Sequence, residues 1–191
     1  MPALPATAAW RHVEARDGFE VLFLATDDDG LRFDGRSTAV EEGNAWAVTY
    51  SLSLDADWVT RSALVVSWTA SGERERTLEG DGAGGWRVDG NPAPELEGCL
   101  DVDLEASAFT NALPVHRLEL DVGERANAPA AYVRALDLSV ERLEQNYLRL
   151  EDDGERRRYE YAAPRFSYLD ELVYDGFGLV LDYPGLATRV A

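Results

Sequence analysis

Apolar and polar residues alternate with a period of two along much of the chain. In the run WAVTYSLSLD, which starts at Trp46, large apolar side chains occupy every second position and small or hydroxyl-bearing ones lie between them. Because successive side chains of a strand point to opposite faces, this alternation predicts a strand with one buried face. A similar run extends from Trp58 to Trp68, and only Asp55-Ala56-Asp57 separates the two runs. We expect these two strands to be antiparallel neighbours joined by a hairpin.

Shorter runs recur along the chain, each bounded by glycine, asparagine, aspartate or proline. They predict strands at Trp10–Ala15, Phe19–Ala25, Leu31–Val40, Arg74–Leu78, Trp86–Val88, Cys99–Ala106, Val115–Val122, Ala131–Val140, Gln145–Glu151, Arg157–Ala162, Phe166–Tyr174 and Leu179–Tyr183. Val140–Leu150 and Phe166–Leu172 also fit helical spacing, so the pattern allows one short helix. About a dozen short strands separated by turn residues are typical of a barrel or sandwich. We therefore predict a mostly β protein, a single domain over residues 1–191, whose antiparallel strands form a closed or half-open barrel with little helix.

Two distant segments share a faint similarity. Leu54–Arg61 and Leu181–Arg189 each begin with the Leu-Asp that ends a predicted strand and reach Thr-Arg a few residues later. An internal duplication relating the two halves of the chain would explain this similarity, and chance would explain it equally well.

The charge is the most unusual part of the composition. All 18 basic residues are arginines and there is no lysine, whereas aspartate and glutamate total 36, which gives a net charge of −18. Such a surface repels the phosphates of nucleic acids and of anionic membranes, so we exclude nucleic-acid binding. A high-salt cytoplasm, where ions screen self-repulsion, and a GC-rich genome both explain this acidic composition.

The start of the chain and its cysteine content favour the cytoplasm. Residues 1–10 lack a basic segment, and Pro2 and Pro5 interrupt them before an apolar segment could form, so we expect no secretory signal. Cys99 is the only cysteine, which excludes an intramolecular disulfide. No uninterrupted apolar run approaches the roughly 20 residues that a membrane-spanning helix needs. We therefore expect a cytoplasmic protein without stable membrane insertion.

Four local strings resemble those of a known protein family. They are Asp57–Arg61 (DWVTR), Gly98–Leu104 (GCLDVDL), Phe109–Pro114 (FTNALP) and Asp182–Leu186 (DYPGL), to which Arg117, Gln145 and Tyr147 can be added. In this order they resemble the Putative glycolipid-binding family, a domain of unknown function. The resemblance implies a β-rich, curved or barrel-like fold, similar in shape to mycobacterial lipoproteins that carry glycolipids. Those lipoproteins are exported and lipid-anchored, whereas Cys99 lies mid-chain and is unsuited to such an anchor.

The function that this resemblance implies is non-enzymatic binding of an amphiphilic molecule, a glycolipid or a related acyl-bearing compound. Arg61 shares its predicted strand face with Ala63 and Val65, and Arg117 lies between Val115 and Glu119 on its face. A guanidinium at the mouth of a barrel could hold an anionic headgroup through two parallel hydrogen bonds. A structural ion pair with one of the many carboxylates is the other interpretation of each arginine.

Aromatic and polar side chains are further candidates for the ligand site. One set of aromatic candidates could line an apolar pocket or belong to the core: Trp46, Tyr50, Trp58 and Trp68. A second set could hydrogen-bond sugar hydroxyls: Tyr147, Tyr159 and Tyr161. Thr110 and Asn111 lie in a predicted connection between strands, and Tyr183 ends a predicted strand at the turn Tyr183-Pro184-Gly185. There they could line the mouth of a barrel, or they could only form tight turns.

Asp101 and Asp103 share one face of a predicted strand. They could hold a cation, or act as acid and base in a hydrolase-like enzyme on the same ligand, while a solvated strand face is the other interpretation. The chain has no zinc-ligand spacing, nucleophile elbow or phosphate-binding loop, so we expect no catalytic residue, metal or cofactor. An interaction module filled by its own side chains is a third interpretation. The pattern does not predict an oligomeric state.

Overall fold

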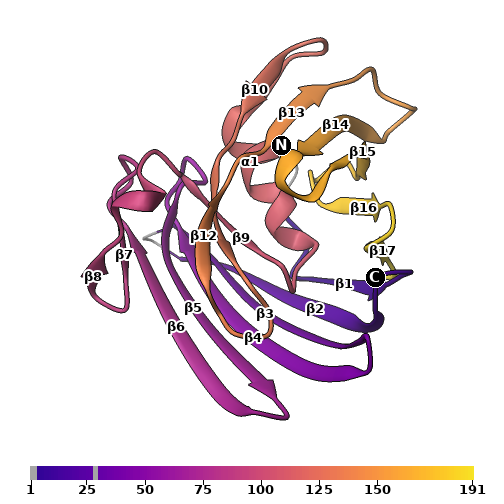
Figure 1. Cartoon of the computed structure of the whole chain (residues 1–191). Helices are drawn as coiled ribbons and strands as arrows, with labels where there is room; N and C mark the ends of the chain where they lie inside the picture. Colours follow the sequence, from indigo (N-terminus) through magenta and orange to yellow (C-terminus); the bar gives the residue numbers. More distant parts are fainter. Residues whose placement is uncertain (1–3, 28–29) are drawn as a thin grey trace.

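The computed structural model describes residues 4–27 and 30–191 and is dominated by strands (Figure 1). The strands are β1 (Thr7–His12), β2 (Asp17–Asp27), β3 (Gly30–Glu41), β4 (Asn44–Leu54), β5 (Thr60–Thr69), β6 (Gly72–Gly80), β7 (Trp86–Val88), β8 (Asn91–Pro92), β9 (Asp101–Leu104), β10 (Arg125–Asn127), β11 (Ala130–Val133), β12 (Val140–Leu143), β13 (Asn146–Arg149), β14 (Arg157–Ala163), β15 (Tyr168–Tyr174), β16 (Val180–Tyr183) and β17 (Ala187–Arg189). The helical segments are α1 (Ala112–Leu118) and the 3₁₀ turns η1 (Pro94–Leu96), η2 (Phe109–Asn111) and η3 (Pro164–Phe166).

One large antiparallel sheet carries most of these strands. In the described residues its order is β10-β13-β14-β15-β16-β17-β1-β2-β3-β4-β5-β6-β7-β8. Strand β1 pairs with both β2 and β17, so the two ends of the chain lie side by side in the middle of the sheet. The terminal strands β8 and β10 are not paired with each other there, so the sheet is open rather than closed. The prediction of a mostly β protein is confirmed.

The sheet curves around a smaller layer, as Figure 1 shows. Helix α1 lies in the space between the β1–β6 part and the β13–β17 part of the large sheet. The small sheet, ordered β12-β11-β9, pairs β11 antiparallel with β12 and parallel with β9. This parallel pair departs from the antiparallel arrangement that we predicted. Among the described residues, none of the helices has the length and apolar character required to span a membrane.

Tight two-residue turns join neighbouring strands of the large sheet. Strands β3 and β4 are joined by Glu42 (φ 49°) and Gly43 (φ 80°), both left-handed. Asp89 (φ 49°) and Gly90 (φ 76°) join β7 and β8 in the same way. Two left-handed residues form the type I′ turn, whose twist matches that of the strands it connects. Local turn chemistry therefore sets the register of these pairs.

The predicted hairpin of the two alternating runs is confirmed, because β4 pairs antiparallel with β5. Trp58, however, lies in the connection rather than in a strand, with a φ of 64°. Asp55 organises this connection by accepting hydrogen bonds at Oδ1 from the N–H groups of Asp57 and Val59, each at 3.0 Å. An aspartate that binds backbone N–H groups ahead of it is a common way to close such a loop.

The predicted strand Val115–Val122 is wrong, because its first half belongs to helix α1. Pro114 lies in the first turn, where its missing N–H breaks no helical hydrogen bond, and Glu119 ends the helix in a left-handed conformation (φ 46°). Five of the seven helical residues are buried. A short helix buried on most sides has no polar stripe, so its sequence lacks the helical periodicity that would reveal it.

The predicted strand Ala131–Val140 is wrong in its middle. It is a hairpin between β11 and β12, whose connection is held by the Asp137 carboxylate and has Leu138 at φ 54°. The sequence contains no glycine at this turn, which is why the pattern suggested one continuous strand.

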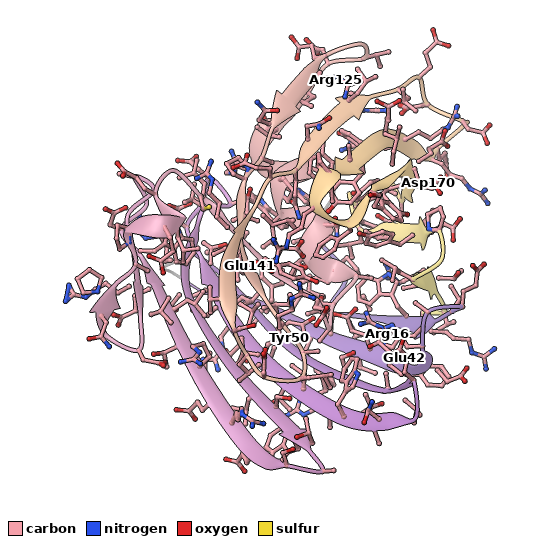
Figure 2. The ribbon with its side chains drawn as sticks, viewed as in Figure 1. Arg16, Glu42, Tyr50, Arg125, Glu141 and Asp170 are labelled. Atoms are coloured by element: carbon pink, nitrogen blue, oxygen red, sulfur yellow. The ribbon has the colours of Figure 1, made fainter. Side chains whose placement is uncertain are left out.

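The concave interior of the large sheet is filled by the protein's own side chains (Figure 2). Trp10, Leu22, Phe33 and Leu52 are completely buried there. Phe109 from η2 packs on Phe33 with ring centres 4.7 Å apart. Trp46 and Tyr50, which we considered as pocket residues, are therefore core residues. The interior along β1–β5 does not form the broad apolar hollow that we expected to receive an acyl chain.

Candidate functional site

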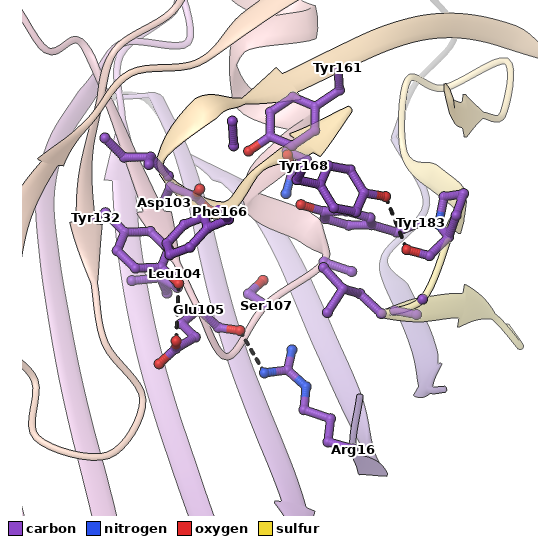
Figure 3. A pocket seen from close by; sticks show the side chains of 18 of the residues that line it. Arg16, Asp103, Leu104, Glu105, Ser107, Tyr132, Tyr161, Phe166, Tyr168 and Tyr183 are labelled. Atoms are coloured by element: carbon purple, nitrogen blue, oxygen red, sulfur yellow. Dashed lines mark hydrogen bonds between the residues drawn. The ribbon is translucent and has the colours of Figure 1, made fainter. Parts of the chain in front are cut away.

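A pocket of about 390 Å³ opens between the small sheet and the C-terminal strands (Figure 3). Its aromatic wall consists of Tyr132 on β11, Tyr161 on β14, Phe166 on η3, Tyr168 on β15 and Tyr183 on β16. Its polar groups are Arg16, Glu41, Asp103, Glu105, Ser107, Asn111 and Arg134. Pockets of a few hundred Å³ with apolar walls and a few polar groups are typical sites for small molecules.

The aromatic residues hold one another in place. Tyr168 packs on Tyr183 and on Tyr161 with ring centres 5.5 and 5.8 Å apart, and Tyr132 packs on Phe166 at 5.4 Å. The Tyr168 hydroxyl also donates a hydrogen bond to the carbonyl oxygen of Pro184 at 3.0 Å. Tilted and edge-on contacts of this kind restrain the rings, so the pocket wall is preformed.

Asp103 is the buried acid of the pocket. Its Oδ1 accepts a hydrogen bond from the Thr110 hydroxyl at 2.8 Å, and its Oδ2 accepts one from the Gln145 amide at 2.5 Å. Burial raises the pKa of Asp103 to about 6, against the two hydrogen bonds, because an ionised carboxylate is poorly solvated in the interior. Asp103 therefore changes charge in the weakly acidic range.

This raised pKa predicts a pH-dependent stability. The pKa of the unfolded carboxyl is near 3.8, so the folded state binds the proton more tightly. The stabilising contribution is complete below pH 3.8 and is lost as the pH rises through about 6, in total roughly 2–3 kcal/mol. Thermal unfolding of the wild type and of Asp103→Asn between pH 4 and 7 should show the wild type losing stability relative to the variant. Parallel stability curves for the two proteins would contradict the raised pKa of Asp103.

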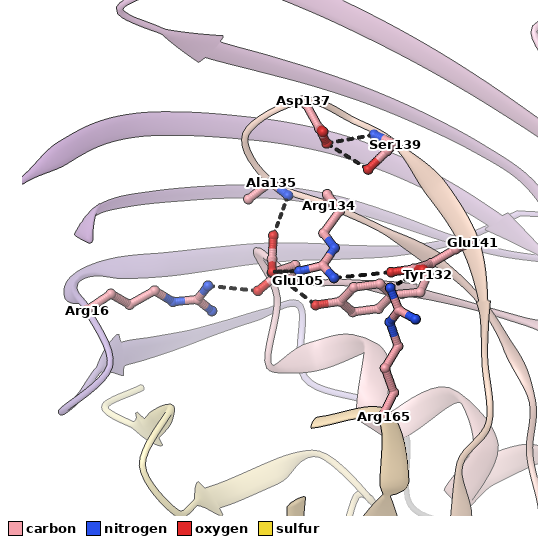
Figure 4. Close-up of polar contacts among 9 residues, drawn as sticks. All are labelled: Arg16, Glu105, Tyr132, Arg134, Ala135, Asp137, Ser139, Glu141 and Arg165. Atoms are coloured by element: carbon pink, nitrogen blue, oxygen red, sulfur yellow. Dashed lines mark hydrogen bonds and ion pairs between the residues drawn. The ribbon is translucent and has the colours of Figure 1, made fainter. Parts of the chain in front are cut away.

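Glu105 organises the other side of the pocket (Figure 4). Its carboxylate accepts hydrogen bonds from the Ala135 N–H at 2.7 Å and from the Tyr132 hydroxyl at 3.1 Å. Arg134 bridges Glu105 and Glu141, at 3.2 Å to each, and Arg165 adds an ion pair with Glu141 at 2.7 Å. Two carboxylates and two guanidinium groups thus form one chain of balanced charge.

Several of the candidate residues lie at or directly behind the pocket, among them Tyr161 in its aromatic wall. Asn111 and Tyr183 line it, and Thr110 holds Asp103. Tyr147 is fully buried behind it and donates a hydrogen bond from its hydroxyl to Asn111 Oδ1 at 2.9 Å. The Phe109–Pro114 string therefore supplies pocket residues as well as a turn.

Three further candidates, Arg61, Arg117 and Trp58, lie elsewhere. Arg117 forms a bidentate ion pair with Asp101, at 2.9 and 2.6 Å. Trp58 stacks on His116 with ring centres 3.6 Å apart. Arg61 is exposed and lies 3.7 Å from the Asp55 carboxylate. None of these three side chains lines the pocket.

The proposed acid–base pair is also separated by these contacts. Asp101 is occupied by Arg117, whereas Asp103 lines the pocket together with Glu105. Within the described ranges, no three histidine, cysteine, aspartate or glutamate side chains are grouped so that they could hold a metal ion.

Sequence reasoning missed several pocket residues. Arg16, Glu105, Tyr132, Phe166 and Tyr168 all line the pocket, yet none was a candidate. The Arg16 contact with Glu105 spans 89 residues, so no local pattern indicates it. The sequence did contain one indication for Glu105, because it shares the predicted strand face of Asp101 and Asp103.

A strongly curved, open antiparallel sheet around a short helix, with an aromatic-walled pocket at its inner edge, defines a β-rich, barrel-like protein. The chain belongs to the Putative glycolipid-binding family, whose model matches residues 7–189. It is similar to a crystal structure of a DUF1089 family protein from Pseudomonas aeruginosa, with 36% identity, a TM-score of 0.77, and coverage of 90% of this chain and 92% of that one.

A more remote structure shares the fold alone. It is a beta-barrel-like protein of the domain of unknown function DUF1849 from Brucella abortus, with 10% identity and a TM-score of 0.53. The match covers 97% of this chain and 94% of that one. No curated protein matches the chain.

Proposed function

We propose that the protein binds an amphiphilic molecule without transforming it, and that the pocket receives the polar, hydroxyl-bearing end of that molecule. The description of the family supports a binding role. The observation that carries the proposal is the combination of a preformed aromatic wall with buried hydrogen-bonding groups in one pocket. Aromatic faces pack on the C–H faces of sugar rings, while Asp103, Asn111 and tyrosine hydroxyls can bind ring hydroxyls.

The size of the pocket limits what it can enclose. About 390 Å³ lies at the lower end of the range for small-molecule sites, and the sheet interior beside it is filled. We therefore place the headgroup and the first part of an attached chain in the pocket. The rest of the chain would lie outside, near the exposed Phe166 on the pocket rim.

Phe166→Ala tests this placement. We expect the variant to bind octyl β-D-glucoside about tenfold more weakly than the wild type, because it loses apolar area at the rim. Isothermal titration below the micelle concentration measures the change. Leu169→Ala is the matched control, since Leu169 is also exposed (64% against 42% for Phe166) but does not line the pocket. Equal binding by wild type and Phe166→Ala would contradict the placement, and absence of binding by the wild type would contradict the proposed function.

A second candidate function is favoured by one observation. Asp103, with a pKa of about 6 in an accessible pocket, has the property expected of a general acid. Both of its oxygens already accept hydrogen bonds from Thr110 and Gln145, which suits a binding group better. Release of nitrophenol from nitrophenyl glycosides by the wild type, and its loss in Asp103→Asn, would support a hydrolase instead.

A further inference from the structure

Arg16 is a buried guanidinium whose charge has no partner in direct contact. It lies between β1 and β2, is 7% exposed, and lines the pocket (Figure 3). Its Nη1 donates a hydrogen bond to the backbone carbonyl oxygen of Glu105 at 2.8 Å, and the guanidinium lies over the Trp46 ring at 5.2 Å. Within residues 4–27 and 30–191, its Nε has no hydrogen-bond partner and no carboxylate forms an ion pair with it.

Two of the three carboxylates near Arg16, those of Glu105 and Glu20, are already engaged. Glu105 belongs to the balanced chain with Arg134, Glu141 and Arg165 shown in Figure 4. Glu20 accepts three hydrogen bonds, from the hydroxyls of Tyr50 and Ser107 at 2.5 Å and from the N–H of Ala108 at 2.7 Å. The negative charges of Glu20 and Glu105 still favour the charged form of Arg16, but neither carboxylate forms an ion pair with it.

Burial without a contacting anion is costly for a guanidinium, because water is removed and one backbone hydrogen bond and one ring contact replace only part of it. Burial accordingly lowers the pKa of Arg16, against the attraction of Glu41, Glu20 and Glu105. An anionic group that enters the pocket would supply the missing contact through charge-assisted hydrogen bonds in a water-poor environment.

We propose that Arg16 binds an acidic group of the ligand, a carboxylate, sulfate or phosphate, so that the pocket selects an anionic amphiphile over its neutral counterpart. The inference rests on the proposed function and specifies the class of ligand. The half-buried Glu41, at the edge of the same pocket, opposes this selection because it attracts Arg16 and repels an incoming anion.

Two amphiphiles that differ by one carboxylate test the proposal. Octyl β-D-glucoside and octyl β-D-glucuronide have the same ring and chain, and titration at about 0.15 M ionic strength measures the ratio of their dissociation constants. The wild type should bind the glucuronide at least about tenfold more tightly. Sodium glucuronate, which has no alkyl chain, should bind more weakly than octyl glucuronide.

Three variants assign the preference to Arg16. Arg16→Gln should abolish it, whereas Arg87→Gln should retain it, since Arg87 is an exposed arginine on β7 that also donates to one backbone carbonyl oxygen. Glu41→Gln, at a half-buried surface position, should increase the preference, which keeps the test valid if Arg16→Gln unfolds.

The outcomes separate the two proposals. Equal binding of both octyl compounds by the wild type would overturn the role of Arg16 and leave the binding function standing. An unchanged ratio in a folded Arg16→Gln, or in Glu41→Gln if Arg16→Gln unfolds, would do the same. Failure of the wild type to bind either octyl compound would overturn both. Binding of free glucuronate as tightly as its octyl derivative would support the contact with Arg16. It would overturn the proposal that the ligand is amphiphilic, because the alkyl chain would contribute nothing.

Discussion

Arg117→Met is expected to destabilise the protein by about 3 kcal/mol, because it leaves a buried carboxylate without its partner. Arg117 and Asp101 form two hydrogen bonds between α1 and β9, with side-chain exposures of 12% and 2%. Methionine fills much of the arginine volume but leaves the Asp101 carboxylate buried without a partner. The midpoint of thermal unfolding should fall by about 6–12 °C for a chain of this size.

The cost of Arg117→Met should depend on pH. Burial raises the pKa of Asp101 and Arg117 opposes that rise, so removing Arg117 raises the folded-state pKa further. The variant then loses stability as the pH rises through that higher pKa, and its deficit relative to the wild type should shrink in acid. Unfolding curves at several pH values measure this trend.

Two comparisons isolate the buried pair. Arg125→Met breaks the exposed pair between Arg125 and Glu160, which has the same N–O distance of 2.6 Å, and should cost less than about 1 kcal/mol. The double variant Asp101→Leu/Arg117→Met removes both charges and should recover most of the loss. If Arg117→Met cost no more than Arg125→Met, the pair would contribute nothing beyond a surface contact.

Gly35→Ala is expected to cost about 3 kcal/mol, although it adds a single methyl group. Gly35 on β3 faces Tyr50 on β4, and a Cβ at this position would overlap the Tyr50 ring. The ring crosses the glycine to bring its hydroxyl within 2.5 Å of the buried Glu20 carboxylate. Displacing Tyr50 would therefore overpack the core and remove one of three donors from Glu20.

Gly176→Ala is the control for this substitution. Gly176 has no positive φ, and a Cβ there would meet no atom within 4 Å, so its stability should change by less than about 0.5 kcal/mol. Urea unfolding of both variants measures the difference. A Gly35→Ala protein as stable as Gly176→Ala would show that Tyr50 can move without losing its contact with Glu20.

Those parts of the fold that have one buried and one solvated face were predictable. Strands β3 to β5 alternate because side chains on one face pack in the core while those on the other face meet water. Helix α1 and the β11–β12 turn were missed for the opposite reason. The helix is buried on most sides, and the turn uses Leu138 rather than glycine at its left-handed position.

The pocket was predictable in part. Tyr161 and Asp103 were candidates on predicted strands, and both line it. Asn111 and Tyr183 belong to strings that indicated functional loops, and both line the pocket. Arg117 was considered for a headgroup, and its partner proved to be Asp101 within the same chain. A guanidinium's neighbours among 36 acidic residues cannot be assigned from spacing, because the pairing depends on how distant strands approach.

The sequence by itself determined the β-rich class, the family and the register of the local hairpins, since these depend on alternation, turn residues and short strings. Only the tertiary structure decided which side chains surround the pocket and that Arg16 lines it without forming an ion pair in the described part of the chain. The physical reason is that burial and charge pairing arise from contacts between segments far apart in the chain, such as the 89 residues between Arg16 and Glu105. No local pattern contains those contacts.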